Sequence, residues 1–377
     1  MIAAAVSIRG STGVLDGPTC LRFTCPMPDV TPSARHSGVV YASSGQGYEL
    51  PVIDVSLPAF AVADDPQSME GLRRTFAESE QRRKRLPKFM LKWLLRWMSR
   101  RSQLARELFY GATEVLSGMS TYVMKLGSAN LVAPFNTSLD QQLAAAPGVI
   151  SMRLRLQQLA QMTAAGLRND LLARPHAPLH LVNIGGGTAI DSLNILILLR
   201  RSTPAALRRP ITIHLLDPDT AGPQFGQRAL DSLLQGGPLA GLTVRFLHTP
   251  YNWNDTQPLI SLVQELSLAN TIVVASTEGA LFEYADDATV LSNLSALRAG
   301  GGVTLVAGTV TRADPLTREF LTTSRFKLVP RGAEGLQRLA TQAGFALAQV
   351  ESALLSDQVL LRPAAASLDA SGPLVAK

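Results

Sequence analysis

The 377-residue sequence has few of the residues that hold small secreted domains together, since it contains only two cysteines, Cys20 and Cys25. A disulfide framework is therefore excluded, and two thiols alone cannot complete a four-ligand zinc site. Only five histidines occur, and neither they nor the acidic residues recur at metal-ligand spacing, so no metal site is predicted. We expect both thiols to be reduced, which is typical of the cytoplasm.

Long hydrophobic runs are also missing, although 46% of the residues are hydrophobic. The longest candidate, residues 195–199, is far shorter than the roughly 18 residues that a membrane span needs. The first six residues lack the basic start and the long apolar stretch of a secretory signal peptide. The apolar content nevertheless exceeds that of a disordered chain, so the sequence predicts a soluble, folded protein with a sizeable core.

Acidic residues are absent from one segment, residues 82–101, which contains nine Lys and Arg residues. Removing these nine from the 35 basic residues of the chain leaves 26, against 29 acidic residues. The net charge of +6 therefore arises from this segment alone. A charge concentrated in one short segment does not favour nucleic acid as a partner.

The same segment carries a second pattern, because Phe89, Trp93 and Trp97 recur every four residues and Leu104 follows seven residues later. This spacing predicts an amphipathic helix with basic residues beside its apolar side. We expect the helix to cover the main domain, with its cations in solvent. The alternative is a helix that lies on a membrane surface or binds a partner protein.

The sequence divides into four parts. Residues 1–75 are rich in Gly, Ser, Pro and Thr without a lasting helical period, so we expect an irregular, largely flexible segment. Residues 76–175 have helical spacing and predict a helical cap. Within 176–365, short apolar runs alternate with helical stretches, which is typical of a parallel sheet with crossover helices. The tail, 366–377, is expected to be disordered.

The alternation in the third part predicts seven strands and five helices. We expect strands at 179–184, 211–216, 243–248, 271–275, 302–307, 346–352 and 358–362, and helices at about 189–201, 224–235, 256–268, 286–298 and 333–343. Only a short turn separates the last two strands, so they form a hairpin and the last strand is antiparallel. The predicted fold class is α/β, a Rossmann-like doubly wound seven-strand sheet preceded by an N-terminal helical cap.

The most specific local pattern joins a hydrophobic strand to a helix through three glycines, Gly185, Gly186 and Gly187. Glycine lets the backbone bend sharply and approach a ligand beside the free N–H groups of the helix N-terminus. The next strand ends at Asp217, where a carboxylate can accept hydrogen bonds from both ribose hydroxyls of a nucleoside. A tight turn without a ligand, followed by a carboxylate that caps a helix, is the alternative. The nicotinamide fingerprint fails, because Ile190 stands where it requires Gly or Ala.

Counted as Gly-x-Gly-x-Gly, the turn supplies Gly185, Gly187 and Ala189. With these residues, the segment from about 175 to 363 resembles the class I S-adenosylmethionine-dependent methyltransferases. The resemblance implies a seven-strand sheet whose last strand is antiparallel, and S-adenosylmethionine as the cofactor. It covers roughly half of the chain.

The resemblance also implies roles for residues at the carboxyl ends of the strands, where ligands of open α/β sheets bind. Asn183 stands where the family usually has an acidic residue, and its amide oxygen would hold the ammonium group of the cofactor. Trp253 would stack on adenine, or else pack in the core. The implied cofactor contacts are Asn183, Gly185, Gly186, Gly187, Ala189, Asp217, Asn252, Trp253 and Ser276.

Acceptor and catalytic residues are expected in the loop after the fourth strand and in the cap. The loop supplies Phe282, Glu283 and Tyr284, unless the last two merely precede the next helix. The cap supplies Tyr110 and Phe135 as substrate contacts and Tyr122 as a catalytic aromatic residue. None of the histidines lies in a loop that usually carries a base, which leaves Glu278 as the candidate general base.

The predicted function is methyl transfer to a small molecule of bacterial secondary metabolism, with most of the rate supplied by positioning and desolvation. One alternative keeps the cofactor but closes its aminocarboxypropyl chain and releases methylthioadenosine, as azetidine-forming enzymes do. Another is a non-catalytic protein that binds a membrane or a partner through residues 82–101. The acceptor, and whether the helical part forms a homodimer, stay open.

Overall fold

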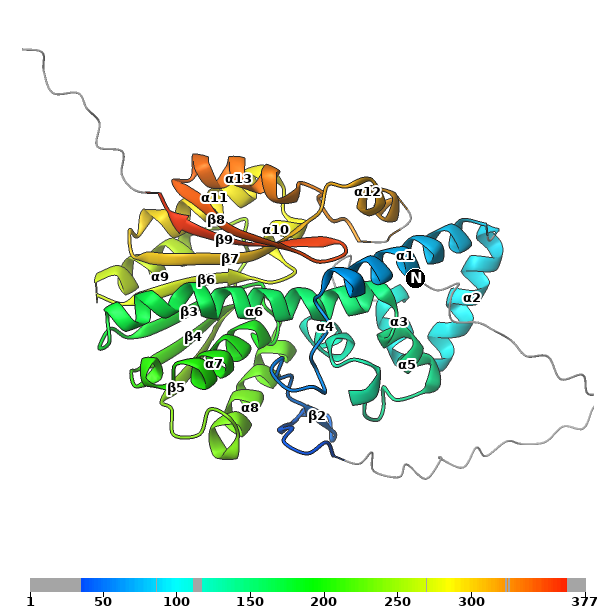
Figure 1. Ribbon diagram of the computed structural model, residues 1–377, viewed down its shortest axis with the longest axis horizontal. Coiled ribbons are helices and arrows are strands. Elements are labelled where there is room, and N and C mark those ends of the chain that lie inside the picture. Colours follow the sequence, from blue (N-terminus) through cyan, green and yellow to red (C-terminus); the bar gives the residue numbers. More distant parts are fainter. Residues whose placement is uncertain are drawn as a thin grey trace, which may run out of the picture.

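The computed structural model describes residues 35–85, 87–110, 117–268, 270–322, 324 and 326–364. Its centre is a seven-stranded sheet (Figure 1). The strands are β3 (Leu179–Ile184), β4 (Ile211–Leu216), β5 (Val244–Thr249), β6 (Ile272–Thr277), β7 (Val303–Thr311), β8 (Phe345–Ser352) and β9 (Ser356–Pro363). Their order is β5-β4-β3-β6-β7-β9-β8, and β9 runs antiparallel to both of its neighbours. The fold class predicted from the sequence is confirmed.

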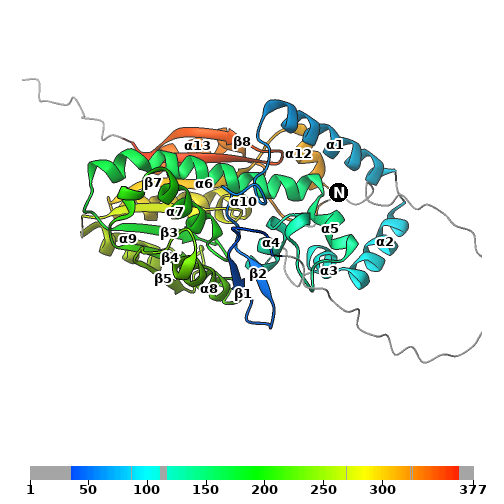
Figure 2. The same cartoon turned by 60° about the horizontal axis from the view of Figure 1, so that its bottom comes forward.

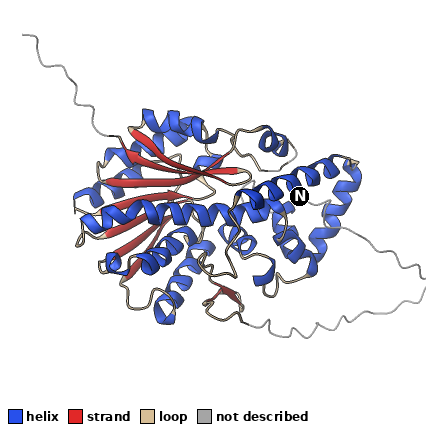
Figure 3. Cartoon of the chain, in the orientation of Figure 1, coloured by secondary structure: helices blue, strands red, loops and turns tan. Residues whose placement is uncertain are grey.

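Helices cover both faces of this sheet (Figure 3). One face packs against α6 (Pro147–Ala173), α7 (Ile190–Ser202) and α8 (Ala221–Gly236), the other against α9 (Gln257–Leu268), α11 (Asp287–Ala299) and α13 (Gly332–Gln342). In β3, Leu179 and Leu181 point into the first core, while Val182 and Ile184 point into the second. Because both faces are buried, the central strands are continuous apolar runs instead of alternating ones.

Most predicted elements lie within a few residues of the observed ones, but β7 extends further. It was expected at 302–307, yet Thr309 and Thr311 continue it and pair with Gln358 and Ser356 of β9. Both threonines are buried. In the sequence, polar residues at the end of a strand look like the start of a loop, and only the pairing with β9 shows that the strand continues. The sequence analysis also missed two short helices, α10 (Leu281–Tyr284) and α12 (Pro315–Leu321).

The remaining elements gather at one end of the sheet (Figure 2). They are β1 (Tyr41–Ser43), β2 (Glu49–Pro51), α1 (Pro66–Lys84), α2 (Lys88–Arg101), α3 (Gln103–Tyr110), α4 (Gly118–Lys125), η1 (Ser128–Asn130) and α5 (Ser138–Ala144), whereas the short η2 (Pro204–Leu207) follows α7. Helical structure therefore begins at Pro66, ahead of the boundary predicted at 75/76. Cys20, Cys25 and the tail 366–377 lie outside the described residues.

Part of the segment expected to be flexible is instead built into the core. Residues 52–55 are buried against α7. Val55 N–H donates to Asn194 Oδ1 at 2.9 Å, and Asn194 Nδ2 donates back to Ile53 O at 3.0 Å. A single buried amide thus satisfies the backbone of an extended segment that has no strand partner there.

Helix α2 does not cover the main domain as expected. Phe89 and Trp93 are 73% and 68% exposed, and Leu104 belongs to the next helix because α2 ends at Arg101. The helix is held to the body through the fully buried Met98 and the partly buried Leu94, Leu95 and Trp97, so Trp97 is the one residue of the predicted apolar side on α2 that packs against the core. None of the described helices is long and apolar enough to cross a membrane.

The buried His214 and the half-buried His180 form a pair that predicts a pH-dependent stability. His180 Nδ1 and His214 Nε2 are 2.9 Å apart across β3 and β4. Burial, the neighbouring His180 and Arg245 together lower the pKa of His214 to about 4 from the ordinary 6.5. Between pH 6.5 and 4 the unfolded chain therefore binds a proton that the folded chain does not, so stability falls as the pH falls through this window.

We expect this histidine to account for a loss of about 2–3 kcal/mol between pH 7 and pH 4. Urea unfolding at several pH values should show a flatter profile for His214→Asn than for the wild type. Changing the exposed His176 to Asn is the matched control and should leave the profile as it is. Parallel profiles for the wild type and His214→Asn would disprove the assignment.

Candidate functional site

A cavity of about 490 Å³, here called the main cavity, lies at the carboxyl ends of β3, β4 and β6 and is roofed by α4. Strand order reverses on either side of β3, and ligands of open α/β sheets bind at such a switch point. Its lining comprises Ser117, Gly118, Thr121, Tyr122, Lys125, Gly185, Gly186, Gly187, Thr188, Ile190, Asp217, Pro218, Asp219, Trp253, Glu278, Gly279 and Ala280. The predicted glycine turn, ribose carboxylate and indole therefore share one cavity.

The glycine turn owes its tight shape to the roof as well as to the sheet. Gly187 has a φ of +57°, in the left-handed region. A Cβ on Gly187 would lie 2.6 Å from Gly118 Cα, and a Cβ on Gly118 would lie 2.6 Å from Gly187 Cα. The absence of side chains at both positions lets the first residue of α4 rest directly on the turn.

Replacing Gly118 by Ala should therefore destabilise the fold, although Ala normally favours a helix. We expect a loss of about 1–3 kcal/mol, because the methyl group meets backbone that cannot move aside. Gly71→Ala in α1 is the matched control: nothing lies within 4 Å of its added Cβ, and we expect a gain of about 0.5–1 kcal/mol. Thermal or urea unfolding measures both. Equal effects at the two positions would show that the contact is not close.

Asp217 ties the end of β4 to the glycine turn. Its Oδ2 accepts a hydrogen bond from Gly187 N–H at 2.8 Å, and its Oδ1 accepts one from Asp219 N–H at 2.8 Å. Burial raises the pKa of this carboxyl group, although both N–H groups act in the opposite direction. Each oxygen can accept a further hydrogen bond, and the side chain lines the main cavity. Asp217 can therefore hold the turn and a ligand diol together.

Two buried oxygens beneath the glycine turn lack a donor. Asn183 Nδ2 donates to Asp191 Oδ1 at 2.5 Å and to Ser192 Oγ at 3.1 Å. The other two acceptors, Asn183 Oδ1 and Asp191 Oδ2, have no hydrogen-bond partner among the described residues. Asn183 Oδ1 lies only 1.7 Å from where a Cβ of Gly186 would stand. Unsatisfied buried acceptors are costly, so this position favours a ligand that brings N–H donors.

A cluster of four charged side chains joins the helical cap to the loop after β6. Glu278 accepts hydrogen bonds from Lys125 Nζ and, at 2.6 Å, from Arg155 Nε. Arg155 also donates to Glu283 Oε2 at 3.0 Å, and Thr311 donates to Glu283 Oε1 at 3.2 Å. Lys125 comes from the roof helix α4 and Arg155 from α6, the long helix on the first face of the sheet, whereas both carboxylates follow β6. The cluster therefore holds the roof of the cavity in place.

The charges around Glu278 contradict its prediction as a general base. Burial alone would raise the pKa of Glu278, but the cations of Lys125 and Arg155 outweigh burial and hold it below its ordinary value. A carboxylate that two cations stabilise is a weak proton acceptor. By contrast, burial raises the pKa of Glu283 and of Asp191. Glu278 lines the main cavity, where the two buried cations hold its carboxylate.

The catalytic role predicted for Tyr122 is also corrected. Its hydroxyl donates to Pro51 O at 2.7 Å and accepts from Ile53 N–H at 3.2 Å. Burial raises the pKa of this phenol, so it does not ionise near neutral pH. The ring lines the main cavity, and its centre lies 4.7 Å from the centre of the Phe225 ring. Tyr122 thus shapes the roof while its hydroxyl fastens the N-terminal segment.

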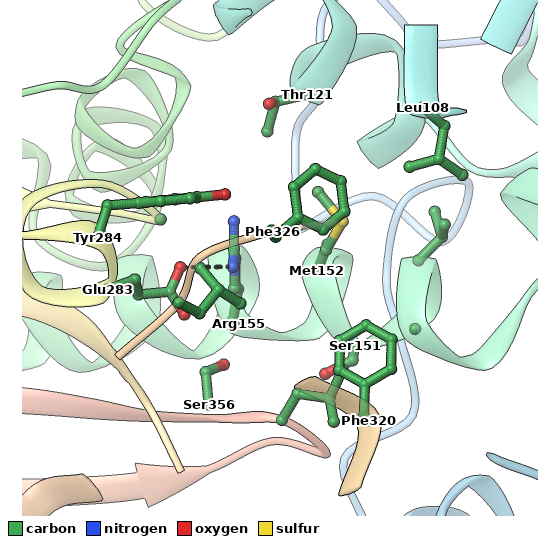
Figure 4. Close-up of a pocket in the computed structure, with 15 residues that line it drawn as sticks. Leu108, Thr121, Ser151, Met152, Arg155, Glu283, Tyr284, Phe320, Phe326 and Ser356 are labelled. Carbon is green, nitrogen blue, oxygen red and sulfur yellow. Dashed lines mark hydrogen bonds and ion pairs between the residues drawn. The ribbon is translucent and has the colours of Figure 1, made fainter. Parts of the chain in front are cut away.

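A second cavity of about 90 Å³, here called the side cavity, shares Thr121 and Gly279 with the main cavity. Figure 4 shows the aromatic rings of its wall with the ion pair of Arg155 and Glu283 among them. Its lining comprises Leu108, Thr121, Gly148, Val149, Ser151, Met152, Arg155, Gly279, Glu283, Tyr284, Phe320, Phe326, Leu328, Leu355 and Ser356. The predicted contacts Glu283 and Tyr284 therefore lie in a mostly apolar chamber next to the main cavity.

Three predicted substrate contacts line neither cavity. Tyr110, at the end of α3, is 53% exposed. Phe135 is buried, and its ring packs edge-on against the ring of Tyr48, with 5.9 Å between the ring centres. Phe282 is buried in the second core, with its ring against Gly308 of β7. Helical spacing and sequence proximity do not reveal which side of an element these rings occupy.

Four predicted cofactor contacts also lie outside the lining of the main cavity, and one of them is the fully buried Asn183. Asn252 is exposed, and its Oδ1 accepts from Asn254 N–H at 3.1 Å. Ser276 is buried in β6, in register with Asn183. Ala189 is fully buried at a φ of +53°, where it completes the turn before α7. Ser276 and Ala189 support the floor and the turn without facing the cavity.

The sequence analysis missed the two cations of the site. Lys125 is the only charged residue between Glu114 and Asp140, and such isolation in an apolar segment is a signal for a buried, paired charge. Arg155 gave no comparable signal, since it is one of several arginines on a long helix. Asp191 lies in the first turn of α7, four residues after Gly187, and the sequence analysis gave it no role.

Neither a protein-family model nor a curated protein sequence matches the chain. Solved structures that match part of the chain include the pyocyanin biosynthetic protein PhzM, with 17% identity over 57% of this chain and 58% of that one, at a TM-score of 0.33. Another match is the O-methyltransferase NcsB1 of neocarzinostatin biosynthesis, solved with S-adenosylmethionine (SAM) and 2-hydroxy-5-methyl naphthoic acid. It has 20% identity over 60% of this chain and 61% of its own chain, with a TM-score of 0.35. LepI, solved in complex with SAM, has 12% identity over 80% of this chain and 95% of its own chain, with a TM-score of 0.40.

The matched parts of PhzM and NcsB1 amount to about three fifths of each protein. The seven-stranded sheet and its antiparallel β9 agree with what the sequence resemblance to the class I S-adenosylmethionine-dependent methyltransferases implies about the fold.

Proposed function

We propose that this protein binds S-adenosylmethionine in the main cavity and transfers its methyl group to a small molecule held in the side cavity. One observation carries the proposal. The glycine turn, Asp217 and Trp253 surround a single cavity of about 490 Å³ at the switch point of the sheet, next to a smaller chamber.

The polar groups present suit the parts of this cofactor. Asp217 would accept from the ribose hydroxyls, and the half-buried Trp253 would stack on adenine. The unpartnered oxygens of Asn183 and Asp191 are acceptors that the ammonium group of the methionine part would satisfy. When bound, the cofactor would supply an electrophilic methyl carbon on a sulfonium.

The charge balance of the site favours a cationic ligand. Four buried carboxylates lie around the two cavities, against the cations of Lys125 and Arg155. The carboxylates are Asp191, Asp217, Glu278 and Glu283. Buried carboxylates in excess are stabilised by a positive charge, and S-adenosylmethionine carries both a sulfonium and an ammonium group.

Positioning is the main contribution that the residues can make to the reaction. Glu278 is held by two cations, which makes it a weak proton acceptor, and Glu283 is held in an ion pair with Arg155. An acceptor that attacks as a neutral amine or as an already ionised oxygen needs no base. Alignment of that nucleophile with the carbon–sulfur bond can supply about 7–11 kcal/mol of the barrier. The apolar wall of the side cavity would exclude water while the methyl group passes.

Calorimetry with S-adenosylmethionine, followed by mass spectrometry of the cofactor incubated with a metabolite extract, tests the proposal. We expect binding, and conversion to S-adenosylhomocysteine together with an extract component that is heavier by one methylene. Methylthioadenosine as the by-product would indicate cyclisation of the aminocarboxypropyl chain instead. Absence of binding at millimolar cofactor would contradict the whole assignment, whereas binding without consumption would contradict only the transfer.

A further inference from the structure

Helix α2 presents three large apolar side chains to solvent. Phe89 is 73% exposed, Met90 46% and Trp93 68%. In these residues, here called the outer patch, Trp93 is the neighbour of both Phe89 and Met90 on the helix surface, because it lies four and three positions after them. The opposite side of the helix, through Met98, is already buried against the body. The outer patch is therefore not required for packing of the described chain.

Exposed cations run along the helix beside this patch. Lys92, Arg96 and Arg100 recur every four residues and are exposed. None of them forms an ion pair with another residue of the described chain, and no acidic residue occurs between positions 82 and 101. Arg101 is held differently, because its guanidinium lies 4.6 Å from the centre of the Trp97 ring.

The helix occupies an accessible position. Figures 1 and 2 both place α2 at the end of the molecule opposite the sheet. The main cavity lies under α4, between the sheet and the helical cap. A flat partner could thus contact α2 without reaching into either cavity.

We propose that α2 docks the protein on an anionic lipid surface, with the outer patch among the acyl chains and the basic row at the headgroups. Aromatic and apolar residues beside Lys and Arg, without acidic residues, are the signature of a helix that lies in a membrane interface. Each cation near an anionic surface adds to the attraction. A symmetric contact with a second copy would place the same cations against each other, so charge complementarity favours the lipid.

Vesicle sedimentation of the full-length protein tests this proposal. We expect binding to phosphatidylcholine vesicles with 30% phosphatidylglycerol to exceed binding to pure phosphatidylcholine at least about tenfold. The Phe89→Ala/Trp93→Ala variant and the Lys92→Glu/Arg96→Glu variant should each bind the anionic vesicles at least about tenfold more weakly. Unfolding curves that match the wild type would show that both variants fold.

Two variants elsewhere serve as matched controls. Leu268→Ala removes a side chain that is 91% exposed at the end of α9, and Arg208→Glu reverses an exposed charge after η2. Both should bind vesicles as the wild type does. The proposal is overturned if the wild type sediments with neither vesicle, or if the two α2 variants bind unchanged. A dimer in sedimentation velocity that Phe89→Ala/Trp93→Ala dissociates, without vesicle binding, would instead assign the outer patch to a contact between copies.

Discussion

Replacing Glu278 by Gln is expected to lower the free energy of unfolding by about 3–5 kcal/mol. The substitution keeps the shape of the side chain but removes its charge. Lys125 and Arg155, whose side chains are only 3% and 12% exposed, would then face each other with a single carboxylate, Glu283, on the side of Arg155. Breaking one partner of a buried ion pair leaves an uncompensated buried charge, and this desolvated charge accounts for the cost.

Urea unfolding followed by circular dichroism measures this effect. Glu319→Gln is the matched control, because Glu319 pairs with Lys84 on the surface and both side chains are more than 40% exposed. An exposed pair contributes less than about 1 kcal/mol. The double variant Lys125→Met/Glu278→Met should recover part of the loss, since it removes both buried charges. A loss below about 1 kcal/mol for Glu278→Gln would show that the cluster does not hold the cap to the sheet domain.

Replacing Asp217 by Ala is expected to weaken binding of S-adenosylmethionine by about 2–4 kcal/mol, a factor of roughly 30 to 1,000. Two effects act together. The carboxylate would no longer accept from the ribose hydroxyls, and Gly187 N–H would lose the acceptor that fixes the turn at 2.8 Å. Charge-assisted hydrogen bonds of this kind are the strong ones in proteins.

Isothermal titration calorimetry on the folded variants provides the measurement. Asp231→Ala is the control, since Asp231 is an exposed carboxylate on α8 that accepts only from Gln227. Its affinity for the cofactor should stay within a factor of two of the wild type. If Asp217→Ala bound the cofactor as tightly as Asp231→Ala, the ribose assignment and the proposed function would both fail.

The features that the sequence predicted well are local or periodic. The glycine turn, the strand before it and the helix after it follow from side-chain size and hydrophobic spacing within some twenty residues. Asp217 is 30 positions from Gly187, but both follow parallel neighbouring strands. Parallel strands bring their carboxyl ends to one edge, so the contact could be foreseen from the strand pattern.

The features that the sequence did not predict depend on how the cap docks. Lys125 and Glu278 are 153 positions apart on elements with no shared periodicity. The hydroxyl of Tyr122 is used by backbone at Pro51 and Ile53, which no local pattern indicates. The apolar stripe of α2 was expected to face the body, yet a helix with apolar residues on more than one side can bury only one of them.

The sequence by itself therefore determined the sheet, its antiparallel strand β9, and the meeting of the glycine turn with Asp217, because these follow from short-range spacing and strand order. Only the tertiary structure decided which charges balance inside the site, which aromatic rings face a cavity and which side of α2 stays in solvent. Those outcomes depend on contacts between segments far apart in the chain, whose packing partners no single segment specifies.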